Sequence, residues 1–315
     1  MIATVYNEAK SISVLLDSIQ AQSRLPDEIV IVDAGSTDDT PRIIESYAAT
    51  LPLKILISPG CNISQGRNLA ITAATGEIIA STDAGVRLSP NWLADIIAPV
   101  ERGESPIAAG FFVADPQTAF ETAMGATVLP HRREINPRSF LPSSRSVAFA
   151  KEAWRATGGY PEWLDYCEDL LFDFALRKLY GPFAWVPGAV AHFRPRPSLR
   201  SFFLQYYRYA RGDGKALLWT KRHLVRYATY VVGPALILTG FWWPWLWLPV
   251  VVGAAAYLAT PYRRLFPMLH DRNVFEKLAA VCWVPLIRIT GDLAKMIGYP
   301  AGLVWHWRHR RAIHA

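Results

Sequence analysis

The feature that most constrains the fold is the alternation of short apolar strands with amphipathic helices over the first 83 residues. Helical stretches separate β-branched runs at 2–6, 28–32, 54–57 and 77–82. In the first helical stretch, apolar residues recur at the spacing of one helix face: Ile12, Leu15, Leu16 and Ile19. Strands joined by helices in this way form right-handed crossovers. The pattern therefore predicts a mainly parallel α/β sheet with helices on both faces.

Polar residues close three of these strands at their carboxyl ends. Thr4, Asp33 and Asp83 hold these positions, and in an open parallel sheet ligands bind beyond the carboxyl ends of the strands. An alanine and a glycine follow Asp83 and leave room beside its carboxylate. This arrangement suits a metal ion bound to a phosphate. The alternative is that Asp83 opens a turn and caps the helix that starts near Pro90.

The chain beyond Asp83 continues the α/β pattern less regularly. The apolar pattern predicts helices at 91–100 and 198–215, a helix with residues 166–169 at its head that runs to about 180, and strands at 106–113, 146–150 and 185–192. Residues 114–146 form a polar, proline-containing stretch rich in arginine. Loops of this length inside a compact domain usually act as lids or binding loops, and we expect that role here.

Charged residues nearly vanish between 224 and 260, in a chain that is 51% hydrophobic. A membrane span needs roughly 20 apolar residues, so this segment predicts a helical hairpin of two slightly short spans. Its tryptophan-rich centre would lie at the far interface, and basic residues such as Arg226 and Arg263 stand at both of its mouths. The positive-inside rule then places both ends in the cytoplasm. The alternative is a buried helical hairpin in a soluble core.

The segment 274–307 is apolar but carries charges that are costly at a bilayer centre, among them Arg288, Asp292 and Lys295. We therefore expect amphipathic, interfacial helices here rather than a third span. The net charge is +7, and basic residues cluster beside the apolar segments, which favours a membrane surface over nucleic acid as a partner. Three widely spaced cysteines give no disulfide framework, as is usual in a reducing compartment.

Short motifs follow one another in a characteristic order. They are Ala-Thr-Val-Tyr-Asn-Glu (3–8), Val-Asp-Ala-Gly-Ser-Thr-Asp-Asp-Thr (32–40), Gly-Arg-Asn (66–68), Thr-Asp-Ala-Gly (82–85), Gly158-Gly159, Glu168-Asp169 and Gln-Tyr-Tyr-Arg-Tyr (205–209). This order resembles the signature of the inverting glycosyltransferase family 2, over residues 1 to about 215. The resemblance implies the GT-A fold, an α/β doubly wound sheet. It also implies a catalytic domain at 1–220, which a C-terminal membrane helical region at 221–315 would follow.

The resemblance assigns several residues to a nucleotide-diphosphate sugar linked to UDP or GDP. Thr4 and Tyr6 would line the nucleoside pocket, with Glu8 supporting it. Asp33 would accept a hydrogen bond from the base or the ribose. Arg67 matches an arginine that contacts base or phosphate, although a glycine precedes it where the family pattern has alanine. On residue type alone, Glu8 could be a first-turn helix acid and Arg67 a solvated cation.

A divalent metal ion, Mg²⁺ or Mn²⁺, is implied as cofactor, with Asp83 as its ligand on the diphosphate. The family's usual Asp-x-Asp is here Asp-Ala-Gly, so one carboxylate is missing. Mg²⁺ accepts one or two carboxylates together with phosphate oxygens and water. His192 follows the last predicted strand, where some relatives carry a histidine near the metal, and it is a second candidate ligand. The alternatives are a structural histidine and phosphate contacts from Arg194 and Arg196.

Inversion needs a base that deprotonates the acceptor hydroxyl as the hydroxyl attacks the sugar. The family match assigns this base to Asp169 and leaves Glu168 to bind acceptor or brace the loop. The alternative for both is a helix N-terminal acid. Trp163 would stack on an acceptor sugar or belong to the core. Gln205 and Arg208, in a motif similar to the Gln-x-x-Arg-Trp of polysaccharide-extending members, would contact the acceptor or lie on a membrane-docking helix.

The sequence thus predicts a membrane-anchored glycosyltransferase that acts on a lipid-linked or cell-envelope glycan acceptor. Its catalytic domain would lie on the cytoplasmic side of the cell membrane. One alternative is a processive polysaccharide synthase, although tyrosine replaces the tryptophan of the motif at position 209. Another is a non-catalytic nucleotide-sugar-binding membrane protein. A dinucleotide oxidoreductase is disfavoured because no Gly-x-Gly-x-x-Gly follows the first strand.

Overall fold

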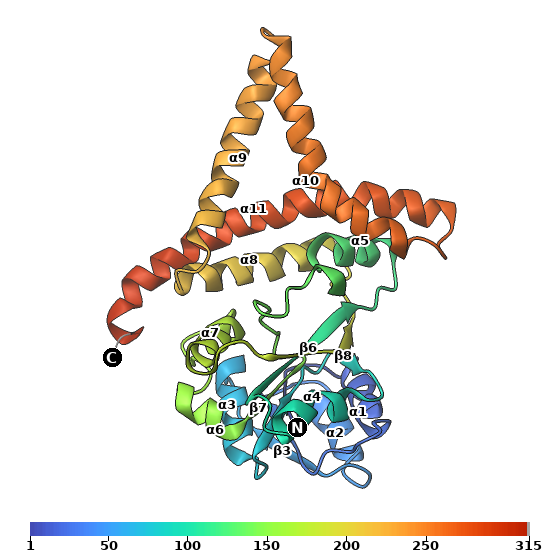
Figure 1. Cartoon of the computed structure of the whole chain (residues 1–315), viewed down its shortest axis with the longest axis vertical. Helices are drawn as coiled ribbons and strands as arrows, with labels where there is room; N and C mark the ends of the chain where they lie inside the picture. The colour runs from blue at the N-terminus through green and yellow to red at the C-terminus, as the bar shows by residue number, and fades with distance from the viewer. Residues whose placement is uncertain (314–315) are drawn as a thin grey trace. The chain divides into compact units, whose positions relative to one another are not determined.

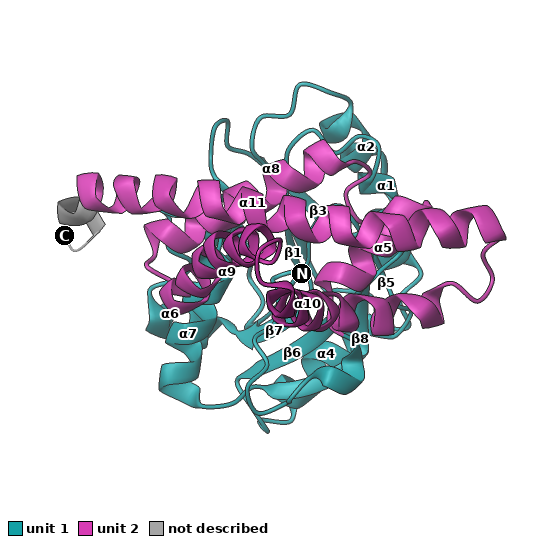
Figure 2. Ribbon diagram, turned by 90° about the horizontal axis from the view of Figure 1, so that it is seen from above, with its two compact units in different colours: residues 1–115, 131–194 teal, residues 116–130, 195–315 magenta. Residues whose placement is uncertain are grey.

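The computed structural model describes residues 1–313, and the chain divides into two compact units (Figure 2). Unit 1 holds residues 1–115 and 131–194, and unit 2 holds 116–130 and 195–315. The functional domains at 1–220 and 221–315 stay a prediction.

An eight-stranded sheet in the order β3-β2-β1-β4-β7-β6-β8-β5 forms the centre of unit 1. Its strands are β1 (Ile2–Val5), β2 (Ile29–Asp33), β3 (Leu53–Ile57), β4 (Ile78–Ser81), β5 (Val86–Leu88), β6 (Ile107–Ala114), β7 (Val147–Ala150) and β8 (Ala184–Phe193). The first four strands pair in parallel, as expected. The carboxyl ends of β1, β2 and β4 therefore meet at one edge of the sheet.

The other half of the sheet is mixed. β7 runs antiparallel to β4 and β6, and β5 runs antiparallel to β8, whereas β6 and β8 are parallel. The expectation of a mainly parallel sheet thus holds for the first four strands only. The chain reaches β7 through a long excursion instead of one crossover helix, so the handedness of βαβ units does not fix its direction. The sequence did not predict β5, because three residues are too few for a periodic pattern.

Helices cover both faces of the sheet, which confirms the doubly wound arrangement. One face packs on α1 (Ile12–Gln20), α2 (Thr40–Ser46) and α4 (Trp92–Glu101). The other packs on α3 (Ile63–Ala73), α6 (Lys151–Thr157) and α7 (Glu168–Tyr180). Successive side chains of a strand point to opposite faces. In β2, Ile29 and Ile31 accordingly join the first core and Val30 and Val32 the second.

The stretch 114–146 is not one long loop, which corrects the sequence prediction. It contains α5 (Ala119–Val128), followed by a short 3-10 helix, η1 (Arg132–Glu134). The side chain of Thr118 accepts a hydrogen bond from the backbone N–H of Glu121 and so caps α5. Residues 120–127 are all buried. A helix that is buried all round has no polar face, and the periodic signal that identifies amphipathic helices is therefore missing.

Unit 2 is helical. Besides α5 it contains α8 (Leu199–Lys215), α9 (Thr220–Thr239), η2 (Pro244–Leu246), α10 (Trp247–Met268) and α11 (Val274–Ile313). Figure 1 shows α9 and α10 as a hairpin that rises beside α11, while α8 runs along α11. Glycines make this last contact close. A Cβ atom at Gly298 or Gly302 would collide with backbone carbonyl oxygens of α8, at Tyr207 and Arg211.

One stretch among the described residues, Pro244–Met268, is long and apolar enough to cross a membrane. The helix α9 carries Lys221, Arg222 and Arg226 in its first two turns and does not meet that criterion. Of the two predicted spans, composition therefore supports one.

Candidate functional site

The loops after β1 and β2 are tied together. The backbone N–H of Asn7 donates to Ser36 Oγ (2.8 Å), and its side-chain Oδ1 accepts from the N–H of Thr37 (2.8 Å). Asn7 adopts a left-handed backbone conformation, with φ of 54°. Asparagine tolerates this conformation better than most residues. The side chain of Tyr6, just before it, is mostly exposed, while Thr4 is partly buried.

Glu8 is bound into the same region. Its backbone N–H donates to Thr40 Oγ1 (2.8 Å), and its carboxylate accepts a hydrogen bond from the hydroxyl of Ser11. Glu8 lies in the loop before α1, whose first turn contains no acid, so the alternative of a first-turn helix acid is wrong. The role of Glu8 beside the nucleoside stays a prediction.

Asp33 is fully buried at the carboxyl end of β2. Its Oδ1 accepts hydrogen bonds from the backbone N–H groups of Gly35 (2.9 Å) and Ser36 (2.7 Å), which fixes the turn that follows. Its Oδ2 is buried and has no hydrogen-bond partner among the described residues. A buried carboxylate oxygen without a partner is costly. A donor group on a ligand would satisfy it.

A buried arginine joins the two acidic parts of the site. Arg67, on α3, contacts Asp83 Oδ1 through Nη2 (2.9 Å) and Glu168 Oε1 through Nη1 (2.5 Å). Only 3% of its side chain is exposed, against 7% for Glu168 and 24% for Asp83. Its guanidinium also lies 5.3 Å from the centre of the Tyr160 ring. The structure thus brings together three predicted site residues. Arg67 is a buried connector, and the alternative of a solvated cation is wrong.

A second arginine completes the surroundings of Asp83. Arg145 Nε lies 3.1 Å from Asp83 Oδ2, and its guanidinium stacks over Phe112 and Phe193. Both carboxylate oxygens of Asp83 therefore face a guanidinium. Sequence analysis did not single out Arg145. The only signal was the abundance of arginine in 114–146.

Gly66 and Asn68, the residues on either side of Arg67, each have a structural role of their own. A Cβ atom on Gly66 would lie 2.9 Å from Cγ2 of Thr4, so the glycine lets α3 approach β1 closely. Asn68 joins α3 to the loop before α7: its Nδ2 donates to the Tyr160 carbonyl (2.8 Å), and its Oδ1 accepts from the Tyr160 N–H (2.9 Å). The Gly159 backbone, at φ of 81°, passes beside this amide.

The acidic pair begins α7. Cys167, the residue before the helix, has a φ of 65°, which is unusual for a residue other than glycine, asparagine or aspartate. Glu168 is buried against Arg67, whereas Asp169 keeps some exposed surface. Protein atoms nevertheless crowd its carboxylate. This burial, together with the negative charge of Glu168, raises the pKa of Asp169 to about 7, while Arg67 and Arg145 act in the opposite direction. The adjacent acids therefore have different surroundings, as expected.

A third acid, Asp173, lies one turn further along α7 and was missed by sequence analysis. It is 3% exposed, and its Oδ2 has no hydrogen-bond partner among the described residues. Burial and the neighbouring charge of Asp169 raise its pKa well above the ordinary range, against the influence of Arg67. Its spacing of four residues from Asp169 places both acids on the same face of a helix, which could have identified it from the sequence.

His192 lies on β8, where it pairs with Arg87 of β5. Its Nε2 is 3.2 Å from Ser89 Oγ. Burial and the charge of Arg87 lower its pKa, against the effect of Asp115. A neutral imidazole could bind a metal. Within the described residues, however, no three His, Cys, Asp or Glu side chains gather as a metal site. The roles of Asp83 and His192 as metal ligands stay predictions.

The predicted acceptor residues fall in different units. Trp163 precedes α7 in unit 1 and is partly buried. Gln205 and Arg208 belong to α8 in unit 2, where Gln205 Nε2 donates to the Tyr209 hydroxyl (2.8 Å) and Arg208 is exposed. Their roles toward an acceptor stay predictions.

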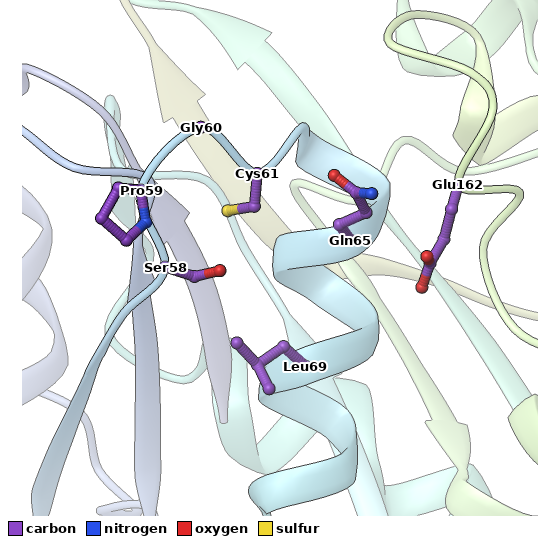
Figure 3. A pocket seen from close by; sticks show the side chains of 7 residues that line it. All are labelled: Ser58, Pro59, Gly60, Cys61, Gln65, Leu69 and Glu162. Carbon is purple, nitrogen blue, oxygen red and sulfur yellow. The ribbon is translucent and has the colours of Figure 1, made fainter.

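A shallow, open pocket of about 410 Å³ lies between the end of β3 and α3 (Figure 3). Its lining comprises Ser58, Pro59, Gly60, Cys61, Gln65, Leu69 and Glu162. The Gly60 N–H donates to the carbonyl of Ala34 (2.9 Å), so the pocket adjoins the loop that follows Asp33. None of the predicted site residues lines it.

The chain resembles known proteins in sequence. Residues 1–150 match the family model described as Glycosyl transferase family 2. The succinoglycan biosynthesis protein ExoA of Rhizobium meliloti is 26% identical over 295 residues, which are 87% of this chain and 87% of that protein. Undecaprenyl-phosphate 4-deoxy-4-formamido-L-arabinose transferase of Yersinia enterocolitica is 29% identical over 110 residues, or 33% of each chain.

The fold is also found among solved structures. The mannosyltransferase PcManGT from Pyrobaculum calidifontis, in complex with GDP-Man and Mn²⁺, superposes with a TM-score of 0.56 at 20% identity. The superposition covers 97% of this chain and 86% of that one. At this identity the likeness concerns the fold, which is of the GT-A type. The family model over residues 1–150 and the sequence relatives named as glycosyltransferases support glycosyltransferase family 2 and a transferase enzyme.

Proposed function

We propose that the protein is an inverting, metal-assisted glycosyltransferase. It moves a sugar from a nucleotide diphosphate to a lipid-linked or cell-envelope glycan acceptor. The observation that supports this most is the contact chain from Asp83 through Arg67 to Glu168. It connects the predicted diphosphate side of the site, at the end of β4, with the predicted acceptor side, at the head of α7. A donor and an acceptor sugar have to meet between these two sides.

The donor half of the proposal uses the carboxyl ends of the parallel strands. Thr4 and Tyr6 take the nucleoside, and the unpaired Oδ2 of Asp33 accepts a hydrogen bond from the base or ribose. Asp83 would hold Mg²⁺ or Mn²⁺, and such an ion would neutralise the charge that develops on the leaving diphosphate. Arg145 adds a fixed positive charge at the same carboxylate. The structure of PcManGT was solved with GDP-Man and Mn²⁺, and a UDP- or GDP-sugar is accordingly the donor class to test.

Asp169 is the proposed base. The acceptor hydroxyl oxygen bonds to the anomeric carbon while the bond from that carbon to the diphosphate oxygen breaks, and the hydroxyl proton passes to the carboxylate of Asp169. A raised pKa suits this task, because a base acts best when its pKa lies near the working pH. Glu168 cannot share it, since its Oε1 is held by Arg67. Glu168 instead fixes the start of α7.

We further propose that the α9–α10 hairpin enters the membrane from the cytoplasmic side. Tyr230 of α9 and Tyr257 of α10 both contact Asp292 of α11. From these tyrosines toward the tip of the hairpin, α9 continues to Thr239 and α10 begins at Trp247. These nine or ten residues reach about 15 Å at 1.5 Å per residue. The hydrocarbon core is about 30 Å thick, so the hairpin would end near its middle and both ends would stay on one side. This depth favours a hairpin anchor over two complete spans.

A screen of donor hydrolysis tests the proposed function. Purified protein is incubated with UDP- and GDP-linked sugars in Mg²⁺, Mn²⁺ or EDTA, and nucleoside diphosphate release is followed. The proposal predicts release from one donor class, dependent on a divalent ion and lost in Asp83→Ala. Hydrolysis that is unchanged in EDTA and in the variant would refute the metal assistance. Absence of release from all donors, with and without a polyprenyl phosphate or glycan acceptor, would refute the transfer itself.

A further inference from the structure

A polar cluster lies in unit 2 where α9 and α10 meet α11. Its centre is Asp292, in the middle of α11, which is 9% exposed. Asp292 Oδ1 accepts a hydrogen bond from Arg226 Nε (2.7 Å) on α9. Its Oδ2 accepts from the hydroxyls of Tyr257 (2.6 Å) and Tyr230 (3.4 Å). One carboxylate thus links α9, α10 and α11 through three hydrogen bonds.

Two cationic side chains of α11, Arg288 and Lys295, also face this polar cluster. Arg288 lies 4.2 Å over the ring of Tyr257, and its Nε is buried without a hydrogen-bond partner among the described residues. Lys295 lies 4.9 Å over the ring of Tyr206. Neither side chain forms an ion pair within the part of the chain that the structure describes. Together with Arg226 of α9, they form a cluster of three cations.

The neighbouring charges do not balance this cluster. The other nearby acid, Asp213, lies 3.3 Å from His223 Nε2, and the second ring nitrogen of His223 lies 3.1 Å from Arg226 Nη1. Burial and the charge of Arg226 lower the pKa of Lys295 to about 8, although Asp292 acts against this shift. The three cations outnumber the two carboxylates, Asp292 and Asp213, so a positive charge is in surplus in a half-buried place. Such a place favours an anion.

The surface around the cluster indicates which anion it meets. Exposed apolar side chains recur along α11 at helical spacing: Leu286, Ile289, Leu293 and Ile297. Arg288, Asp292 and Lys295 share a different face of the same helix, toward α9 and α10. Val231 and Val232 of α9 are exposed just beyond Tyr230. A helix with an apolar stripe on one face and basic side chains on another lies at a membrane surface, where the anions are lipid phosphates.

We propose that Arg288 and Lys295, together with Arg226, bind the phosphate group of a membrane lipid at the base of the α9–α10 hairpin. The guanidinium groups of the arginines offer paired donors that match phosphate oxygens, and the ammonium of Lys295 adds a point charge. This inference rests on the membrane association proposed above. It adds a site that is separate from the transfer centre of unit 1 and that fixes the depth of α11 in the headgroup layer.

The test uses the full chain and the double variant Arg288→Gln/Lys295→Gln. Binding is measured by cosedimentation with vesicles of phosphatidylcholine, with and without phosphatidylglycerol, at about 0.15 M salt, where exposed charges are largely screened. The variant Lys277→Gln/Arg308→Gln, which removes two charges near the ends of the same helix, is the matched control. The variant Arg288→Lys/Lys295→Arg keeps the charge and tests whether the helix still folds with altered side chains. Tryptophan fluorescence compares vesicles with inorganic phosphate alone.

We expect binding to phosphatidylglycerol vesicles to weaken by about 30-fold in Arg288→Gln/Lys295→Gln, which removes two cations that contact the lipid phosphate. The control should lose about threefold at most, because its two charges lie away from the base of the hairpin. The charge-keeping variant should bind as the wild type does. Equal losses in both charge-removing variants, or none in either, would overturn the site. A fluorescence response to inorganic phosphate as strong as that to vesicles would replace the lipid with a free anion. Donor hydrolysis by the wild-type preparation is recorded in parallel, so failure of the proposed transfer is recognised separately.

Discussion

Arg67 and Glu168 are 101 residues apart in the chain, yet Arg67 Nη1 lies 2.5 Å from Glu168 Oε1 in a buried ion pair. The same guanidinium holds Asp83 at 2.9 Å. One side chain of α3 therefore positions both the end of β4 and the start of α7. Each of these elements carries a residue of the proposed reaction, so the geometry of the site depends on this arginine.

Replacing this arginine should destabilise the protein strongly. Arg67→Met keeps an unbranched, flexible side chain, shorter than that of arginine, but leaves two carboxylates without their cation. Breaking a buried pair in this way typically costs about 3–5 kcal/mol. The free energy of unfolding in urea measures the effect. Arg42→Met, which breaks an exposed pair with Asp39, is the control and should leave stability unchanged within error. Equal unfolding midpoints for Arg67→Met and the wild type would contradict the connecting role.

The glycine before Arg67 should resist substitution for a steric reason. Gly66→Ala places a Cβ atom 2.9 Å from Thr4 Cγ2, and such overpacking usually costs about 1–3 kcal/mol. Alanine gains about 1 kcal/mol in helix propensity, so the net loss is modest. The double variant Gly66→Ala/Thr4→Ser removes the methyl group in the way but keeps the hydroxyl. Thermal unfolding should show the single variant below the wild type and the double variant at or above it. A double variant no more stable than the single one would exclude the steric explanation.

Asp173 should make the protein less stable as the pH rises. The pKa of Asp173 is raised in the folded state. Between the ordinary pKa of aspartate and this raised pKa, the folded state therefore binds more protons than the unfolded state. The free energy of unfolding accordingly falls as the pH rises through that window. Asp173→Asn cannot ionise and mimics the protonated acid. Its stability should match that of the wild type near pH 4 and exceed it increasingly toward neutral pH, as urea midpoints would record. A constant difference across this range would contradict a buried, protonated Asp173.

Arg145 should compete with the metal ion for Asp83. Arg145→Gln frees Oδ2 of Asp83 from a guanidinium at 3.1 Å, in a pair that is about one quarter exposed. The metal concentration for half-maximal donor hydrolysis should therefore fall by about threefold, which is the effect of a partly exposed ion pair. The KM for the donor should rise, because a cation near the diphosphate is lost. Arg155→Gln, on the exposed side of α6, is the control. An unchanged or higher metal requirement in Arg145→Gln would show that the two cations do not compete.

Local patterns were enough to predict the first half of the fold. Alternating strands and helices up to Asp83 form a doubly wound parallel sheet, because each crossover is short and its hand is fixed. The later strands β6, β7 and β8 were also predicted from the sequence, but the direction in which they pair depends on contacts between distant parts of the chain. The buried helix α5 shows the same limit, since its hydrophobic pattern has no polar side.

The sequence points to candidate site residues where polar residues end a strand or begin a helix, as Asp33, Asp83 and Asp169 do, and to Arg67 through its motif. Their roles stay predictions. The connections between them were not predictable. That Arg67 joins Asp83 to Glu168, that Arg145 faces the same carboxylate and that Asn68 holds the Tyr160 loop all follow from tertiary packing. Sequence spacing carries no information on contacts of this range.

The most direct test of the account is sugar transfer by Asp169→Asn with a matched donor and acceptor. The variant keeps the shape of the side chain but cannot accept the hydroxyl proton. General-base catalysis contributes about 10²–10⁴-fold, so kcat should fall by at least about 100-fold. Donor binding, measured by calorimetry, should stay close to that of the wild type, because Asp169 acts on the acceptor. Transfer within threefold of the wild-type rate would contradict the assignment of Asp169 as the base and, with it, the proposed mechanism.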